Sequence, residues 1–166
     1  MFKKNEFVAY PPFGIAKVTN INELEVSGYK DTFFEFSFLN RTGKAKIPKN
    51  KLERNRIRKL SSKEEIGMAI EELKLKKEIL DPEEGRERIN SGTIIDLAKN
   101  IRDFFEIGEK TIEKVTIYDQ SLNSFIYEAA VVGKMEPKVI AEKIIKILDP
   151  NNEGRKIIYQ NWDEFE

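Results

Sequence analysis

The sequence contains no histidine and no cysteine, and its 166 residues include a single tryptophan. The absence of cysteine excludes disulfides and thiolate chemistry, and the absence of histidine removes the commonest general base and metal ligand. No run of about eighteen uncharged apolar residues is present, so no membrane span is expected. The first residues, "MFKKNEF", lack the apolar stretch of a secretory signal. We therefore expect a cytoplasmic protein, for which binding is a better default than catalysis.

The formal net charge of zero hides an uneven distribution. Residues 1–60 hold 13 Lys/Arg and 6 Asp/Glu, whereas residues 61–166 hold 16 and 23. Nine of the basic residues lie between Arg41 and Lys59, where Glu53 is the one acid. Such a run is usually a solvated face, but it can also bind a polyanion or an acidic protein surface.

Up to about residue 58 the apolar residues recur with the period of a β-strand. The strand-like segments are "EFVAY", "GIAKVTNINELEV", "DTFFEFSFL" and "GKAKIP", with glycine turns at Ser27-Gly28 and Thr42-Gly43. A few short antiparallel strands can bury a core by curling into a barrel, so we expect an SH3-like or Tudor-like β-barrel. Phe13, in the turn "YPPFG", is expected to pack within the protein, over the barrel end or against the helices, rather than contact a partner.

After Lys59 the hydrophobic period becomes helical. The spacing of Ser62 and Glu65 predicts a capping box at a helix start, and Asp81-Pro82 ends that helix or begins the next. Further helices are expected over residues 82–90, 94–105, 121–134 and 137–148. The predicted fold is therefore α+β with two domains: a barrel over residues 1–58 and an all-helical domain over residues 59–148. An acidic, loosely docked tail is expected over residues 149–166.

No catalytic constellation is evident in the sequence. There is no Walker loop, no Gly-x-Gly-x-x-Gly, no nucleophile elbow and no metal-ligand spacing. The carboxylate pairs, such as Glu71-Glu72 and Glu83-Glu84, are typical of a solvated helix face. We expect no enzymatic activity, no metal or other cofactor and no small-molecule substrate.

Three segments occur in a telling order: the opening "VAYPPFGIAKV", the later strand "GKAKIP" and the helical "SGTIIDLAKNIRDFF". In this order of motifs, residues 1–148 resemble the CarD/CdnL family of bacterial transcription regulators. The predicted barrel is also similar to the polymerase-interacting domain of the transcription-repair coupling factor. The resemblance implies a barrel that binds the β-subunit of RNA polymerase and a helical domain that stabilises the open promoter complex.

The resemblance also implies which residues contact the polymerase. An exposed strand edge can pair with a strand of the partner while its side chains select that partner. The positions that match are Leu24, Lys44, Lys46, Ile47, Pro48 and Lys49. Lys46 stands where the family carries a basic side chain, whereas Leu24 stands where the family can have a basic residue. The lysines would therefore carry the electrostatic part of the interface.

The helical region departs from the family at one position. The family often has a tryptophan ahead of the Ser91-Gly92 break, which is used as a wedge in the minor groove. The segment "EILDPEEGRERINSG" has none, and Trp162 lies in the tail. The implied promoter contacts are therefore weak, sequence-independent phosphate contacts from Arg86, Arg88, Lys99 and Arg102.

Two alternatives stay open. In one, the barrel binds polymerase or another protein and the helical domain has a different, non-DNA target. In the other, the chain is a small enzyme or an RNA-binding barrel that uses residues 41–59. That segment contains no Phe, Tyr or Trp on which bases could stack, which counts against RNA binding.

Overall fold

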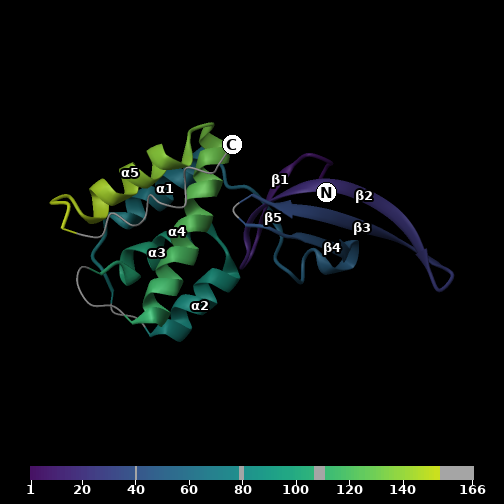
Figure 1. The fold of residues 1–166 in the computed structure, drawn as a ribbon, viewed down its shortest axis with the longest axis horizontal. Helices are drawn as coiled ribbons and strands as arrows, with labels where there is room; N and C mark the ends of the chain where they lie inside the picture. The colour runs from purple at the N-terminus through teal and green to yellow at the C-terminus, as the bar shows by residue number, and fades with distance from the viewer. Residues whose placement is uncertain (40, 79–80, 107–110, 154–166) are drawn as a thin grey trace.

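The computed structural model describes residues 1–39, 41–78, 81–106 and 111–153. Strands come first and helices follow, so the sheet and the helices form separate halves of the molecule (Figure 1). The elements are β1 (Phe7–Tyr10), β2 (Gly14–Val26), β3 (Tyr29–Phe38), β4 (Lys44–Pro48), the 3-10 turn η1 (Lys49–Lys51), β5 (Arg58–Lys59), α1 (Lys63–Leu73), α2 (Pro82–Ser91), α3 (Ile94–Phe104), α4 (Ile112–Gly133) and α5 (Pro137–Leu148). The α+β arrangement expected from the sequence is confirmed.

The strands form an antiparallel sheet in the order β4-β3-β2-β1-β5. On one face, here called the inner face, the alternating side chains Val18, Phe34 and Phe36 are buried together with Leu52 and Ile57, which follow β4. The opposite face is called the outer face. Among the described residues, the two end strands β4 and β5 do not pair with each other, so the sheet is open and the expected barrel is not confirmed.

The turn between β2 and β3 forms as its sequence predicts. Val26 pairs with Tyr29, which leaves Ser27 and Gly28 as a two-residue connection. Both have positive φ, 52° and 82°, as a tight hairpin with the right-handed strand twist requires. The β2–β3 hairpin extends beyond the end of β4, because Pro48, the last residue of β4, pairs with Phe33.

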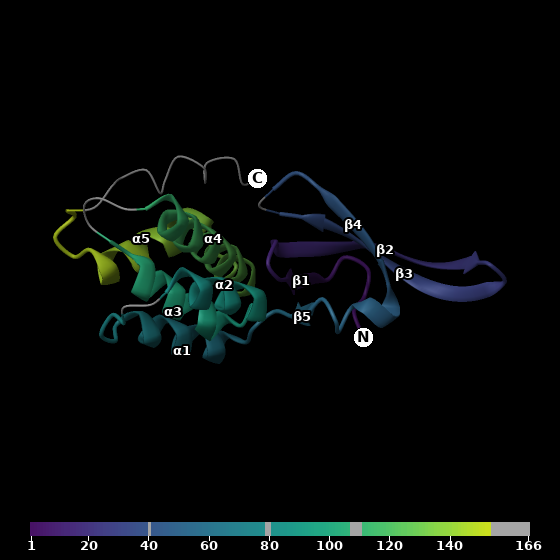
Figure 2. The same ribbon diagram turned by 90° about the horizontal axis from the view of Figure 1, so that it is seen from below.

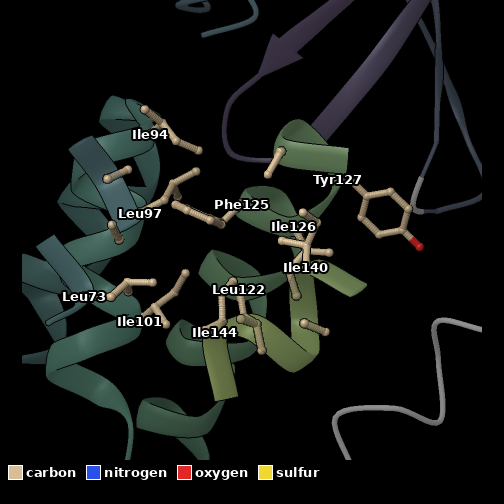
Figure 3. Close-up of a cluster of buried hydrophobic side chains, with 14 of the residues drawn as sticks. Leu73, Ile94, Leu97, Ile101, Leu122, Phe125, Ile126, Tyr127, Ile140 and Ile144 are labelled. Carbon is tan, nitrogen blue, oxygen red and sulfur yellow. The ribbon is translucent and has the colours of Figure 1, made fainter. Parts of the chain in front are cut away.

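The helices enclose a second core. Side chains from α1, α3, α4 and α5 converge there, as the labelled residues of Figure 3 show; they include Leu73, Leu97, Ile101, Leu122, Phe125 and Ile144. The capping box that begins α1 is confirmed, since the Ser62 hydroxyl accepts from the Glu65 N–H and the Glu65 carboxylate accepts from the Ser62 N–H.

One predicted helix boundary is wrong. The helix expected to start near residue 121 begins at Ile112, where the Thr111 hydroxyl accepts from the Lys114 N–H. Its first turns lie largely in solvent, with Ile112 itself 88% exposed, so they lack the apolar period that marks the rest of α4.

A buried ion pair joins the two halves. Arg58 in β5 donates to both carboxylate oxygens of Glu128 in α4, at 2.9 Å from Nη1 and 2.8 Å from Nη2. Its Nη2 also donates to the carbonyl oxygen of Gly92 at 2.6 Å, and the Ser61 N–H donates to Glu128 at 2.8 Å. The Glu128 side chain is 0% exposed, so the carboxylate depends on these donors for its hydrogen bonds.

Apolar contacts support this joint. Ala9 near the end of β1 and Ile15 near the start of β2 lie on the outer face and are buried within the helical core. The ring of Pro11 lies against Gly92, where a Cβ atom would collide with it. Gly92 also has a φ of 68°, so both its backbone and its surroundings favour glycine.

The turn "YPPFG" therefore meets the helices through Pro11 rather than through Phe13. The Phe13 ring packs against Tyr10 and Phe38, with centroids 5.7 and 5.8 Å away, and the Arg41 guanidinium lies 5.1 Å from its centroid. Of the two packing positions expected for Phe13, the one within the sheet half is observed.

The predicted tail is only partly described. Residues 149–153 form a turn in which the Glu153 N–H donates to Asp149 Oδ1 at 2.9 Å. Trp162 and the rest of residues 154–166 lie outside the described residues. Within the described ranges, none of the helices has the length and hydrophobicity that a membrane crossing requires.

Candidate functional site

The free edge of the sheet is formed by β4, the strand from which polymerase contact is expected. Strand β4 is last in the sheet order and pairs only with β3 in the described part of the chain (Figure 2). Its other edge therefore presents backbone N–H and C=O groups that a strand from a partner can use.

Side chains of β4 alternate between the two faces. Ala45 and Ile47 pack against the inner core, whereas Lys44 and Lys46 are exposed. Lys46 forms an ion pair with Glu35 on β3 at 3.5 Å, and its ammonium lies 5.9 Å from the Phe33 centroid. Ile47 thus contributes to folding of the strand, while Lys46 is directed to the outer face.

Leu24 shares the outer face with Lys46. Leu24 pairs with Asp31 of β3, and Pro48 pairs with Phe33, which lies two positions after Asp31 on the same strand. Residues two positions apart on a strand point to the same face. The structure therefore brings Leu24, Lys44, Lys46 and Pro48 onto one face. Lys49 lies beyond the strand, at the start of η1.

Sequence reasoning missed two apolar side chains on this face. Val26 and Tyr29 pair with each other, two positions along the strands from the Leu24–Asp31 pair, and they are 55% and 79% exposed. Leu24 is 37% exposed. The sequence contained a signal for this: Val26 lies two positions after Leu24 in "LEV", and Tyr29 lies four positions before Phe33 in "YKDTF", so all four fall on the same face of their strands. Exposed aromatic and aliphatic residues beside an open strand edge are typical of a protein-binding surface.

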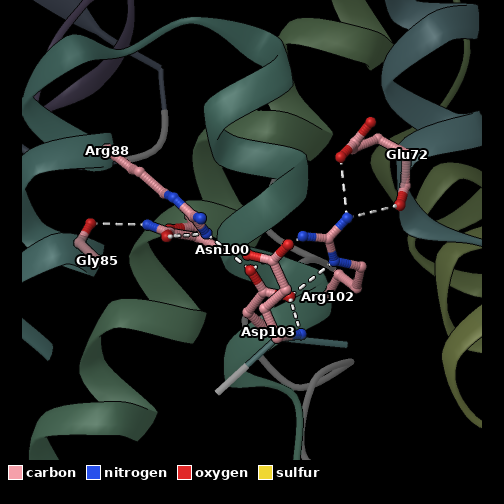
Figure 4. Close-up of polar contacts among 8 residues, drawn as sticks. Glu72, Gly85, Arg88, Asn100, Arg102 and Asp103 are labelled. Atoms are coloured by element: carbon pink, nitrogen blue, oxygen red, sulfur yellow. Dashed lines mark hydrogen bonds and ion pairs between the residues drawn. The ribbon is translucent and has the colours of Figure 1, made fainter. Parts of the chain in front are cut away.

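The four residues expected to contact DNA do not form one cluster. Arg86 on α2 is exposed and forms an ion pair with Glu113 of α4, and its hydrogen bond to Glu113 raises the Arg86 pKa above the ordinary value. Lys99 is half-buried on α3. Arg88 and Arg102 both reach Asp103, from α2 and α3 (Figure 4).

Asp103 is the centre of a buried polar network. Arg102 donates to it from Nε at 2.7 Å, Arg88 donates at 2.8 Å, and the Glu78 N–H donates at 2.9 Å. Burial alone would raise the pKa of the Asp103 carboxyl, but these hydrogen bonds outweigh burial and hold the pKa below its ordinary value. Arg102, 6% exposed, also donates to Glu72 of α1 at 2.9 Å.

This network ties four helices together, α1, α2, α3 and α4. Asn100, 0% exposed, donates from Nδ2 to the Gly85 carbonyl at 2.8 Å and to the Ser121 hydroxyl at 3.1 Å. Guanidinium groups engaged in this way keep few donors for a phosphate. DNA contact by Arg88 and Arg102 stays a prediction, and Arg86 is the most accessible of the four.

The free edge of β4 and the exposed side chains around it suit contact with a protein. In the ranges that the structure describes, no group of three or more His, Cys, Asp or Glu side chains could hold a metal ion. An antiparallel sheet with a free edge, a basic edge strand and exposed apolar side chains beside it defines a protein-interaction module.

The particular module follows from comparison with known families. Residues 2–61 match the model of the CarD-like/TRCF RID domain. The sheet half is therefore a CarD-like RNA polymerase-interacting domain, as the resemblance predicted. The match ends before α1, so it does not extend to the helices. No curated protein matches the chain.

Proposed function

We propose that the protein is a non-catalytic transcription regulator of the bacterial cytoplasm that binds the β-subunit of RNA polymerase. Its sheet half would dock through the free edge of β4 and the outer face, and its helical half, residues 59–148, would modulate the stability of the promoter open complex. The observation that carries the proposal is the RID match over residues 2–61, together with a β4 edge that has no partner strand in the described chain.

The outer face supports a contact of mixed character. The Lys46 side chain is 46% exposed and forms an ion pair with Glu35. Its ammonium is therefore accessible to an acidic group of the polymerase, which would compete with Glu35. Leu24 and Tyr29 supply the apolar area that a charged rim alone lacks. On docking, a partner strand beside β4 would extend the antiparallel sheet by one strand.

Charge reversal at Lys46 tests the docking surface. Lys46→Glu should lower affinity for the purified β-subunit by about 1–3 kcal/mol, roughly 5-fold to 150-fold, because it places a carboxylate where a cation is needed. Lys63→Glu, an exposed lysine at the start of α1, is the matched control and should bind as wild type. An unchanged dissociation constant for Lys46→Glu would reject this placement of the interface.

The promoter contact is expected to be weak and independent of sequence. Arg86→Ala combined with Lys99→Ala should shorten open-complex lifetime without changing affinity for the polymerase, because the docking surface lies in the other half. This pair leaves the Asp103 network intact, which Arg88→Ala would not. Lifetimes equal to wild type across a salt series would exclude these phosphate contacts.

A second candidate function has one observation in its favour. Arg88 and Arg102 are engaged with Asp103 inside the helical half, so fewer cations remain for DNA than the sequence indicated. In this alternative the sheet half still binds polymerase, while the helical half binds a different, non-DNA target. Retained open-complex lifetime together with normal polymerase affinity in the Arg86, Lys99 variant would favour it.

A further inference from the structure

The segment after β4, residues 49–57, forms a hydrogen-bonded helical turn with exposed cations on its surface. The Asn55 N–H donates to the Lys51 carbonyl at 3.0 Å, the Arg56 N–H to Glu53 at 2.9 Å and the Ile57 N–H to Leu52 at 3.1 Å. Leu52 and Ile57 are 5% and 7% exposed and belong to the inner core. The turn is therefore anchored at both ends by buried side chains.

Three cations on this turn, Lys51, Arg54 and Arg56, are exposed. We call them the basic turn. Three other cations of the basic run are ion-paired: Lys46 with Glu35, Arg58 with Glu128 and Lys59 with Glu6. Within the described chain, no carboxylate lies within ion-pair distance of Lys51, Arg54 or Arg56. Glu53 is the one acid in the turn, so the surface keeps a net positive charge.

The backbone at Arg56 adopts a conformation that an arginine rarely takes. Arg56 has a φ of 57° and follows the last helical hydrogen bond of the turn. This left-handed position strongly favours glycine, because a Cβ atom there crowds the neighbouring carbonyl. An arginine at such a position keeps a charge at the expense of backbone conformation.

The basic turn lies on the inner side of the sheet, opposite the outer face of the proposed docking surface. Leu52 and Ile57 cover the inner face, against Phe34 and Phe36. Lys46 and Leu24 lie on the outer face. In Figure 2 the turn begins at η1, the short helical segment near the N label, away from the hairpin tip. A partner bound along the outer face therefore leaves the basic turn accessible.

The composition of the turn favours phosphate over protein as the ligand. Its apolar side chains, Leu52 and Ile57, are buried, so it offers no apolar or aromatic anchor of the kind that protein interfaces use. Phosphate groups need only cations and no such anchor. We infer that the basic turn is a second nucleic-acid contact, in which Lys51, Arg54 and Arg56 bind the phosphate backbone without reading sequence. This inference goes beyond the proposed function and does not depend on contacts of the helical half.

Salt dependence of DNA binding by the full chain tests the inference. Anisotropy of a labelled 30-base-pair duplex of mixed sequence would be measured from 50 to 200 mM salt for wild type and for Lys51→Gln, Arg54→Gln, Arg56→Gln. Three phosphate contacts contribute about −2.7 to the slope of log K against log salt, so wild type should lose about 40-fold more affinity than the triple variant over this range. Equal slopes and affinities would overturn the inference.

A matched control separates the site from overall charge. Lys138→Gln, Lys143→Gln, Lys146→Gln removes the same charge from exposed positions on α5 and should bind the duplex as wild type does. A loss equal to that of the basic-turn variant would mean that net charge alone drives binding, which would overturn the proposed site. Poly-L-glutamate provides an acidic-protein probe. If the basic turn bound poly-L-glutamate but not the duplex, a protein ligand would replace the nucleic acid.

Arg56→Gly gives a readout that a structural role would not produce. The midpoint of thermal unfolding should rise, because glycine fits the left-handed backbone, while duplex affinity should fall because a phosphate contact is lost. A fall in the unfolding midpoint, or unchanged duplex affinity, would contradict this reading of Arg56. Binding of the triple variant to the β-subunit should equal that of wild type; a loss there would place the basic turn in the polymerase interface and overturn the inference.

Discussion

Removal of the Arg58 side chain should lower the free energy of unfolding far more than removal of a surface charge does. Arg58→Ala deletes both hydrogen bonds to Glu128 and the bonds to Gly92, and it leaves the Glu128 carboxylate, 0% exposed, with the Ser61 N–H as its remaining partner at 2.8 Å. Breaking a buried pair by removing one partner costs about 3–5 kcal/mol, because the remaining charge is uncompensated. We expect a decrease of this size in the free energy of unfolding.

Urea unfolding followed by circular dichroism would measure the effect, with the adjacent residue as control. Lys59 pairs with Glu6 at 3.9 Å, and its side chain is 69% exposed, so Lys59→Ala should cost less than about 1 kcal/mol. Arg58→Lys keeps the charge but cannot reproduce the two-oxygen contact together with the bond to Gly92. Its cost should lie between those of the two alanine variants.

A double variant separates the cost of the unpaired carboxylate from the loss of contact. Arg58→Met with Glu128→Leu removes both charges, and it should recover most of the stability that Arg58→Ala loses. If Arg58→Ala costs no more than Lys59→Ala, the pair is screened by solvent and the joint between the halves does not rest on it.

Three further predictions concern the joint, the buried network and the outer face. Gly92→Ala should lower the free energy of unfolding by about 2–4 kcal/mol, because the added Cβ atom clashes with Pro11 and strains the backbone. Gly28→Ala, which has open space around it, should cost only the backbone strain, about 1–2 kcal/mol. Equal costs for the two variants would contradict the Pro11 contact. The lowered pKa of Asp103 adds stability that is present above the unfolded pKa of about 3.9 and is lost as pH falls through the folded pKa. Asp103→Asn should therefore flatten the acid limb of a plot of unfolding free energy against pH. An unchanged acid limb would refute this. Tyr29→Ser should leave thermal stability unchanged, because the ring is 79% exposed, and reduce affinity for the β-subunit by about tenfold; wild-type affinity would exclude Tyr29 from the interface.

Local features of the fold were predictable because their causes are local. The alternation of Phe34 and Phe36 indicates which face of β3 is buried, and the Ser62 and Glu65 spacing marks the start of α1. Thr111 can cap a helix equally well, but the first turns of α4 are exposed and carry no apolar period. That boundary was therefore missed.

The contacts that depend on distant segments were not predictable. Arg58 belongs to a basic run that reads as a solvated face, and its partner Glu128 lies 70 positions further along the chain. Arg102 likewise reads as a surface cation, although it is 6% exposed beside Asp103. Only the packing of the helices shows that these charges are buried and paired.

The Arg58–Glu128 joint has a consequence for how two weak contacts combine. Because it links the sheet directly to the helices, a protein anchored through one half would present the other half in the orientation that this joint favours. The loss of translational and rotational freedom would then occur once, in the first contact, and the second contact would form at a high effective concentration. The second contact therefore depends on the geometry of the joint. A change at Arg58 would therefore alter where the helical half reaches, even when each surface keeps its own affinity.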